Sequence, residues 1–357
     1  MKTCYFHIGF HKTATTTLQQ ICGKNRDILE TAGIYYPKFI YPDHKGNLWN
    51  HSGPLTQIYK RGQVKPFKSK PNAKERRKLR SFNQNRYLKS LKQDNDLFLS
   101  GEALSCWPKE YYLNFLKDLK VYGYNVKVLA LVRTPYSFAC SAIQETLKSG
   151  RYHPLIGLTK PYRVKGSSIQ RIPGRTNQIK TLKDVFGASI NFQPFSKAIE
   201  HPQGPVAFCF EELGLPLPWS SLRQDSDFRS NLSLNNLQAR AMNLFNKQLK
   251  LESNRRKCTK ASLKLVRQGL ETLDSGRFLL TEKEFGLVKQ HYKQINKDTT
   301  NLLGPEFSKE AIKFSDPITD ISNVVESLAR SAVFLASQPN DRSSQVRKER
   351  SKQDGII

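Results

Sequence analysis

The chain has 357 residues, of which 38% are hydrophobic, so it is long enough to bury a large core. Its six cysteines form no Cys-x-x-Cys pair, which argues against a disulfide framework or a zinc site. No apolar run approaches the roughly 18 residues that a membrane span needs. The formal net charge of +28 favours acidic partners or substrates.

Strands and helices alternate in the predicted order of the first 215 residues. Short apolar runs rich in β-branched residues predict buried strands, and apolar residues at helical spacing predict the helices between them. The alternation indicates a three-layer α/β/α fold with a central parallel sheet, like that of P-loop NTPases. The expected strands are 4–8, 34–36, 96–100, 126–132 and 190–195, and the expected helices are 13–22, 25–33, 109–121, 135–149, 179–186 and 206–213.

The first strand leads into a turn with Lys12 and a series of hydroxyl side chains, because residues 13–17 read Thr-Ala-Thr-Thr-Thr. A helix N-terminus offers free backbone N–H groups and the positive end of its dipole, and a lysine and hydroxyls add directed contacts to an anion. The turn therefore predicts a phosphate site, although a threonine-rich N-cap beside an unrelated lysine is the alternative. It is not a Walker A loop, because His11 and Phe6 stand where that motif has glycine.

A second motif follows the strand 126–132. This apolar run ends in Arg133, and Thr134, Pro135 and, eight residues after the arginine, Ser141 follow it. Proline suits the first turn of a helix, so we expect a helix to begin near Thr134 and to carry Ser141 about two turns in. The alternative is an arginine that merely ends a strand beside an N-cap threonine.

Together the two motifs resemble those of sulfotransferases that use 3'-phosphoadenosine 5'-phosphosulfate (PAPS). In that family a Lys-Thr/Ser-Gly-Thr-Thr loop holds the 5'-phosphate, and a strand-end arginine with a serine in the next helix holds the 3'-phosphate. Here Ala14 replaces the usual glycine, which matters if this position needs a positive φ or close backbone approach to phosphate. The resemblance implies PAPS as donor, adenosine 3',5'-bisphosphate as product, and a donor site of Lys12, Thr13, Ala14, Thr15, Thr16, Thr17, Arg133 and Ser141.

The resemblance also implies in-line sulfuryl transfer without a required metal. A sulfuryl group carries less charge than a phosphoryl group, so positioning and charge stabilisation dominate and a divalent ion is dispensable. We expect Lys12 to stabilise the charge that develops on the bridging oxygen and the 5'-phosphate. The candidate strands end in Ser100 and Arg133, and neither supplies a Walker B aspartate.

The acceptor's proton needs a general base, and Glu102 is the first candidate. It follows the strand 96–100 in a Ser-Gly-Glu segment that resembles the Ser-Ser-Glu signature of bacterial family members. Alternatively, Glu102 begins a helix and interacts only with its dipole. His51 is the rival base, although most lone histidines are structural or exposed. We expect His11 to be oriented by the loop rather than to react.

Two segments hold most of the positive charge. Residues 60–92 contain thirteen Lys or Arg and one acid, and residues 146–183 contain nine basic residues and no acid. We interpret 60–92 and 151–175 as basic insertions or a lid that form a funnel for the acceptor, which we expect to be an anionic or neutral polysaccharide or a glycolipid. The alternative is a solvated helix face, for which four residues have helical spacing: Leu79, Phe82, Leu88 and Leu91.

We expect a sulfotransferase domain over 1–305 with a helical part at 228–305, a helical extension at 306–336 and a disordered tail at 337–357. Repeating apolar positions predict the helices of the helical part near 237–249, 261–273 and 284–302. The N-terminus leads almost directly into the first strand, which favours a cytoplasmic enzyme with at most peripheral membrane contact. Two other classes stay open. A P-loop kinase or NTPase should show a glycine before the lysine and an aspartate for Mg²⁺. A non-catalytic polyanion-binding protein would explain the charge, but no aromatic-rich signature of nucleic-acid binding accompanies it.

Overall fold

The computed structural model describes residues 1–40, 49–60, 73–158, 175–223, 233–252 and 276–318. The chain divides into two compact units. Unit 1 comprises Met1–Ser141, Gln170–Leu232 and Lys289–Ile312, and unit 2 comprises Ala142–Ile169, Ser233–Val288 and Lys313–Ile357. All residues predicted for the donor site lie in unit 1.

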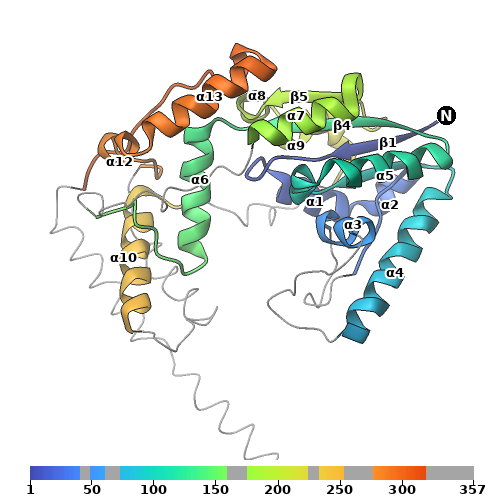
Figure 1. Cartoon of the computed structure of the whole chain (residues 1–357), viewed down its shortest axis with the longest axis horizontal. Helices are drawn as coiled ribbons and strands as arrows, with labels where there is room; N and C mark the ends of the chain where they lie inside the picture. The colour runs from blue at the N-terminus through green and yellow to red at the C-terminus, as the bar shows by residue number, and fades with distance from the viewer. Residues whose placement is uncertain (41–48, 61–72, 159–174, 224–232, 253–275, 319–357) are drawn as a thin grey trace, which may run out of the picture. The chain divides into compact units, whose positions relative to one another are not determined.

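A five-stranded sheet forms the centre of unit 1 (Figure 1). Its spatial order is β2-β3-β1-β4-β5, and every neighbouring pair is parallel. The strands are β1 (Lys2–His7), β2 (Ile34–Tyr35), β3 (Asp96–Ser100), β4 (Tyr124–Val132) and β5 (Ile190–Pro194). The predicted α/β fold with a central parallel sheet is thus confirmed, and each strand lies within two residues of its predicted bounds.

Successive residues of the strands point to opposite faces, which produces two separate cores. On β1, Cys4 and Phe6 face one core and Tyr5 faces the other. On β4, Leu129 and Leu131 share the core of Tyr5. The first core is covered by α3 (Ser52–Tyr59), α4 (Ala73–Leu91), α5 (Lys109–Val121) and α7 (Arg175–Phe186), and the second by α1 (Thr15–Lys24), α2 (Arg26–Thr31), α8 (Phe195–Glu200) and α9 (Gly204–Leu213).

The strand order creates a switch point between β1 and β4, where a ligand site is expected. The chain leaves β1 toward β2 on one side of the sheet and leaves β4 toward β5 on the other side. The carboxyl ends of β1 and β4, which are neighbours, therefore diverge at a switch point. In open parallel sheets ligands bind in the crevice at such a point. The segments 8–14 and 133–137 both begin there.

The helix α4 corrects one expectation about the basic segment 60–92. Phe82, expected on the apolar face, is exposed, whereas Asn83 and Tyr87 are buried. Asn83 exchanges two hydrogen bonds with the backbone of Ile40, and the hydroxyl of Tyr59 donates to that of Tyr87. Polar anchors, which helical spacing of leucines does not reveal, thus decide which face of α4 packs. Residues 61–72 lie outside the described part.

Unit 2 is organised by a buried ion pair between α10 (Asn236–Glu252) and α12 (Glu282–Gly286). Arg240 donates to both carboxylate oxygens of Glu284, at 2.6 and 3.0 Å, and each side chain is only 1% exposed. The guanidinium also donates to Asn236 Oδ1 and to the Gly157 carbonyl. Glu284 in turn accepts from the backbone N–H of Thr281, whose hydroxyl caps the helix.

The C-terminal third differs from the expectation in two places. The helix expected near 284–302 is two helices, α12 and α13 (Lys289–Leu303). The described part of the expected extension, 306–318, has a short turn at Pro305–Phe307 and no helix after it. Ser315 instead pairs with the backbone of Leu280, which keeps this stretch extended. The predicted helix near 261–273, most of the segment 151–175 and the tail 337–357 lie outside the described residues.

Candidate functional site

The turn after β1 contains two residues with a left-handed backbone, a conformation that glycine adopts most easily. Lys12 has φ 69° and Ala14 has φ 59° and ψ 15°, and they are the only non-glycine residues with positive φ among those described. Ala14 is the N-cap of α1. The position at which the resembled family has glycine is therefore a left-handed position here as well, and alanine occupies it at a cost of about 1 kcal/mol.

The hydroxyls of this turn have different surroundings. Thr13 is buried, and its hydroxyl donates to the Phe10 carbonyl at 2.5 Å, so it holds the turn together. Thr15 is also buried, 3.5 Å from Thr13 between the two Oγ1 atoms. Thr16 is exposed and Thr17 is half-buried. Thr16 and Thr17 are thus more exposed to a ligand than Thr13 and Thr15.

Arg133 joins the second motif to the first. It follows β4, is 8% exposed, and its Nη1 donates to the Lys12 carbonyl at 2.8 Å. Its Nε donates to Ser137 Oγ at 2.7 Å, and its guanidinium carbon lies 5.1 Å from the ring centre of Phe195. The structure therefore brings together two motifs that are 121 positions apart in the chain.

Ser137 is a residue that the sequence reasoning missed. It lies in the first turn of α6 (Pro135–Lys148), whose beginning was predicted correctly. Residues four apart share a face of a helix, so Ser137 and the predicted Ser141 lie on the same side of α6. The available signal was the spacing of four residues between Arg133 and Ser137, which places the serine within reach of a strand-end arginine.

Glu102 is positioned by a tight contact at the end of β3. It begins a short helix, Glu102–Cys106, directly after Gly101. A Cβ at Gly101 would lie 2.4 Å from Ser52 Oγ and 2.8 Å from the Ser52 backbone nitrogen, so only glycine fits. Ser52 Oγ also accepts from the backbone N–H of Ala103. The start of α3 thus fixes the turn that presents Glu102.

Glu102 belongs to a cluster with His11 and Cys106. His11 Nδ1 lies 3.7 Å from Glu102 Oε2, and Gln178 Nε2 donates to Cys106 Sγ at 2.9 Å. Donation from the protonated His11 ring to Cys106 and to Glu102 stabilises the imidazolium and raises the pKa of His11 to about 10. The hydrogen bond from His11 lowers the pKa of both Glu102 and Cys106. The cluster therefore contains an imidazolium between two acids at neutral pH, and His11 and Cys106 are contacts that sequence reasoning did not predict.

His51 has no free nitrogen for base catalysis. It is fully buried, its Nδ1 accepts from the Ser100 backbone N–H at 3.2 Å, and its Nε2 donates to the Pro37 carbonyl at 3.0 Å. Burial lowers its pKa to about 3. This geometry gives His51 a structural role, since it ties the end of β3 to the segment after β2.

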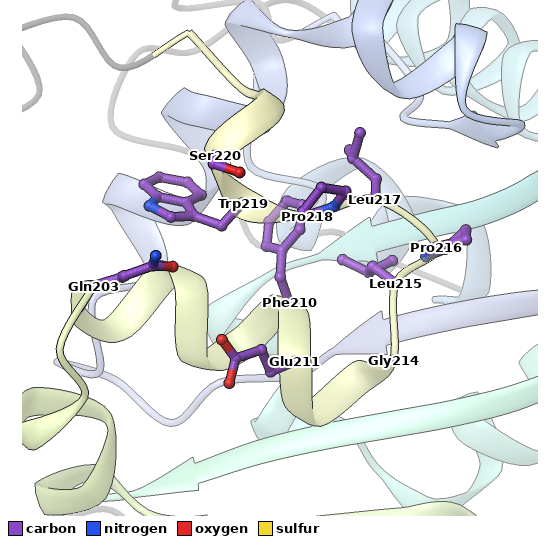
Figure 2. Close-up of a pocket in the computed structure, with 10 residues that line it drawn as sticks. All are labelled: Gln203, Phe210, Glu211, Gly214, Leu215, Pro216, Leu217, Pro218, Trp219 and Ser220. Carbon is purple, nitrogen blue, oxygen red and sulfur yellow. The ribbon is translucent and has the colours of Figure 1, made fainter.

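A pocket lies elsewhere in unit 1, beside α9 (Figure 2). Apolar side chains from α9 and the following turn dominate its lining, among them Phe210, Leu217 and Trp219, with Gln203, Glu211 and Ser220 as its polar side chains. None of the residues predicted for the donor site lines it. Among the described residues, no group of three His, Cys, Asp or Glu side chains could hold a metal ion. No described helix is both long and apolar enough to cross a bilayer.

The chain is an α/β protein with a left-handed turn at the switch point of a parallel sheet. No protein-family model matches the chain, and no curated protein matches it. Among solved structures, the chain is similar to a sulfotransferase from Alicyclobacillus acidocaldarius at 14% identity. The match covers 74% of this chain and 99% of that one, with a TM-score of 0.36.

Proposed function

We propose that the protein is a sulfotransferase that moves a sulfuryl group from PAPS to a hydroxyl or amine acceptor. The observation that carries the proposal is the hydrogen bond from Arg133 to the carbonyl of Lys12. It joins a loop suited to a 5'-phosphate with a strand-end arginine suited to a 3'-phosphate. A ligand with phosphates at both ends of one ribose would contact both motifs at once.

In this proposal the donor's two phosphates are held by different elements. The first turn of α1 supplies backbone N–H groups, with Lys12, Thr16 and Thr17, to the 5'-phosphosulfate. Arg133 and Ser141 contact the 3'-phosphate. Ser137 acts as a positioning residue, because it fixes Nε of the arginine. Thr13 and Thr15 keep the turn in shape from inside, and Ala14 provides its left-handed bend.

The transfer step forms one bond and breaks one. The acceptor oxygen or nitrogen attacks sulfur, the bond from sulfur to the bridging oxygen breaks, and adenosine 3',5'-bisphosphate leaves with that oxygen. Glu102 takes the acceptor's proton, and Lys12 stabilises the negative charge that grows on the bridging oxygen. Because the His11 contact lowers the pKa of Glu102, the carboxylate is ionised and ready to accept a proton at neutral pH. No step needs a metal ion.

The proposed acceptor is an anionic or neutral polysaccharide or a glycolipid. Support comes from the net charge of +28 and from its concentration in the segments 60–92 and 146–183. We place the reaction in the cytoplasm, since no disulfide links the described residues Cys4, Cys22, Cys106 and Cys209.

Calorimetry of the full chain with adenosine 3',5'-bisphosphate, with ATP and with heparin separates the possible classes. The sulfotransferase proposal expects micromolar or tighter binding of the bisphosphate that survives EDTA. Preference for ATP with a Mg²⁺ requirement would instead indicate a kinase or NTPase and overturn the proposal. Binding of heparin without any nucleotide would indicate a polyanion-binding protein. A positive result justifies a screen of labelled PAPS against polysaccharides, glycolipids and phenols.

A further inference from the structure

A carboxylate of the chain itself lies at the N-terminus of α6. Burial raises the pKa of Glu310, which follows α13 in unit 1, and hydrogen bonding by the Thr134 side chain and the Ser137 backbone N–H opposes this rise. Arg133 and Arg175 are its charged neighbours. Its Oε2 is buried and has no hydrogen-bond partner among the described residues. An acidic side chain thus interacts with the same strand-end arginine and helix N-terminus that would bind the 3'-phosphate.

Arg175, at the start of α7, is the second unusual group here. Its side chain is only 4% exposed, yet neither Nε nor Nη1 has a hydrogen-bond partner in the described part of the chain. It lies over the ring of Phe138, 5.7 Å from the ring centre, and close enough to Arg133 for the two charges to interact. Burial and the charge of Arg133 lower its pKa to about 10, so it is still a cation at neutral pH. Buried donors without acceptors are costly, and at binding sites they mark the position of a ligand.

The charges and hydrogen-bonding groups do not balance in this state. Among the described residues, two guanidinium groups interact with one carboxylate, which leaves an excess of one positive charge among these three groups. Two nitrogens of Arg175 and one carboxylate oxygen of Glu310 have no hydrogen-bond partner among the residues that the structure describes. A phosphomonoester has up to three free oxygens and close to two negative charges at neutral pH. It would therefore match the two arginines, the Thr134 hydroxyl and the Ser137 N–H better than Glu310 does.

We propose that Glu310 occupies the 3'-phosphate position as an internal anion, and that Arg175 is a specificity-determining residue that contacts this phosphate once Glu310 leaves. The inference rests on the proposed function for the identity of the ligand. Its consequence is competition, because the donor must displace Glu310 before it binds. If Glu310 holds the position nine-tenths of the time, the apparent affinity for a 3'-phosphate is lowered about tenfold. A nucleotide without that phosphate does not meet this barrier.

Calorimetry on the full chain tests the competition. The wild type, Glu310→Gln and the control Glu306→Gln, which changes an exposed glutamate four residues earlier, are titrated with adenosine 3',5'-bisphosphate and with adenosine 5'-monophosphate. We expect Glu310→Gln to bind the bisphosphate about tenfold more tightly than the wild type, with no change for the monophosphate. The control should match the wild type for both ligands. Equal bisphosphate affinity in all three proteins would overturn the inference and leave the proposed function intact.

Arg175→Lys tests the second half. Lysine keeps the charge but loses the planar group that can donate two parallel hydrogen bonds. We expect the preference for bisphosphate over monophosphate to fall about tenfold, whereas a purely structural role would weaken both ligands equally. Urea unfolding shows whether Arg175→Lys is folded. If it is not, the titrations of Glu310→Gln alone decide the inference.

Inorganic phosphate separates this inference from the proposed function. If no adenine nucleotide binds but Glu310→Gln binds inorganic phosphate more tightly than the wild type, the anion position exists and the donor assignment is wrong. If neither probe distinguishes Glu310→Gln from the wild type, the internal anion is excluded.

Discussion

Ala14 and Lys12 bend the chain in a way that L-residues disfavour. Both have left-handed backbone angles, and the turn that they form is fixed by the Thr13 side chain and by Arg133. The turn thus stores strain that the surrounding hydrogen bonds maintain. Because Ala14 lies at the N-cap of α1, this strain sits where the 5'-phosphate is proposed to bind.

Replacing Ala14 by glycine should stabilise the protein. Glycine adopts φ 59° without steric cost, and we expect the free energy of unfolding to rise by up to about 1 kcal/mol. Urea unfolding measures this as a higher midpoint. Ala32→Gly is the control, because Ala32 has an ordinary φ of −81° and glycine there should only destabilise. A loss of stability in Ala14→Gly would show that the left-handed bend is not strained.

Glu102 is the residue on which the proposed chemistry depends most. Glu102→Gln removes the proton acceptor but keeps the shape of the side chain. We expect kcat to fall by about 10²-fold or more, with the affinity for adenosine 3',5'-bisphosphate unchanged. Steady-state turnover of PAPS and calorimetry measure the two quantities.

In His11→Ala the pKa of Glu102 should rise toward its ordinary value, so the acid limb of the profile of kcat against pH should move to higher pH. If the acid limb does not move, the ionisation of Glu102 does not control kcat.

At the scale of elements, α6 connects the two halves of the proposed donor site. Its first turn supplies Ser137 to Arg133, and its N-terminus faces Glu310. Ser137→Ala should leave Nε of the arginine without its partner, and we expect about fivefold weaker binding of the bisphosphate with little change for the monophosphate. Ser149→Ala, an exposed serine just after the helix, serves as the control. Equal losses for both nucleotides would mean that Ser137 only stabilises the helix.

Much of the element order could be predicted because buried parallel strands are continuous apolar runs. The strand 96–100 and the helix 109–121 have the predicted bounds. The meeting of Arg133 with Lys12 follows from the same logic, since strand ends of a parallel sheet share an edge. The contacts of His11 with Glu102 and Cys106 depend on the bend of a short helix, and Glu310 reaches its place through a loop without periodicity. Sequence spacing carries no signal for either.

At the scale of the whole molecule, the ion pair Arg240–Glu284 offers a way to test the two compact units. Glu284→Gln leaves a buried guanidinium without its anion, and we expect a loss of about 3 kcal/mol. Hydrogen exchange should show faster exchange in α10 and α12 but not in β1 and β4, which belong to unit 1. Glu282→Gln, an exposed change in the same turn, should leave both unaffected. Equal acceleration throughout the chain would show that the units unfold together.

The buried histidines set an acid limit on the fold. Burial lowers the pKa of His7 to about 4, of His51 to about 3 and of His153 to about 4, against an ordinary value of 6.5. Below pH 6.5 these three histidines therefore bind protons in the unfolded chain but stay neutral in the folded chain. Each histidine lowers the free energy of unfolding by about 1.4 kcal/mol per pH unit until its folded pKa is reached.

Urea unfolding between pH 6.5 and pH 5 should show this slope, and His51→Gln should reduce the contribution of these three histidines by about a third even if the variant is less stable at every pH. A slope unaffected by the substitution would assign the acid sensitivity to carboxylates instead. His51, which joins the end of β3 to the segment after β2, thus also makes the stability of the fold depend on pH. Its environment makes mild acidity the condition under which this protein should first lose its structure.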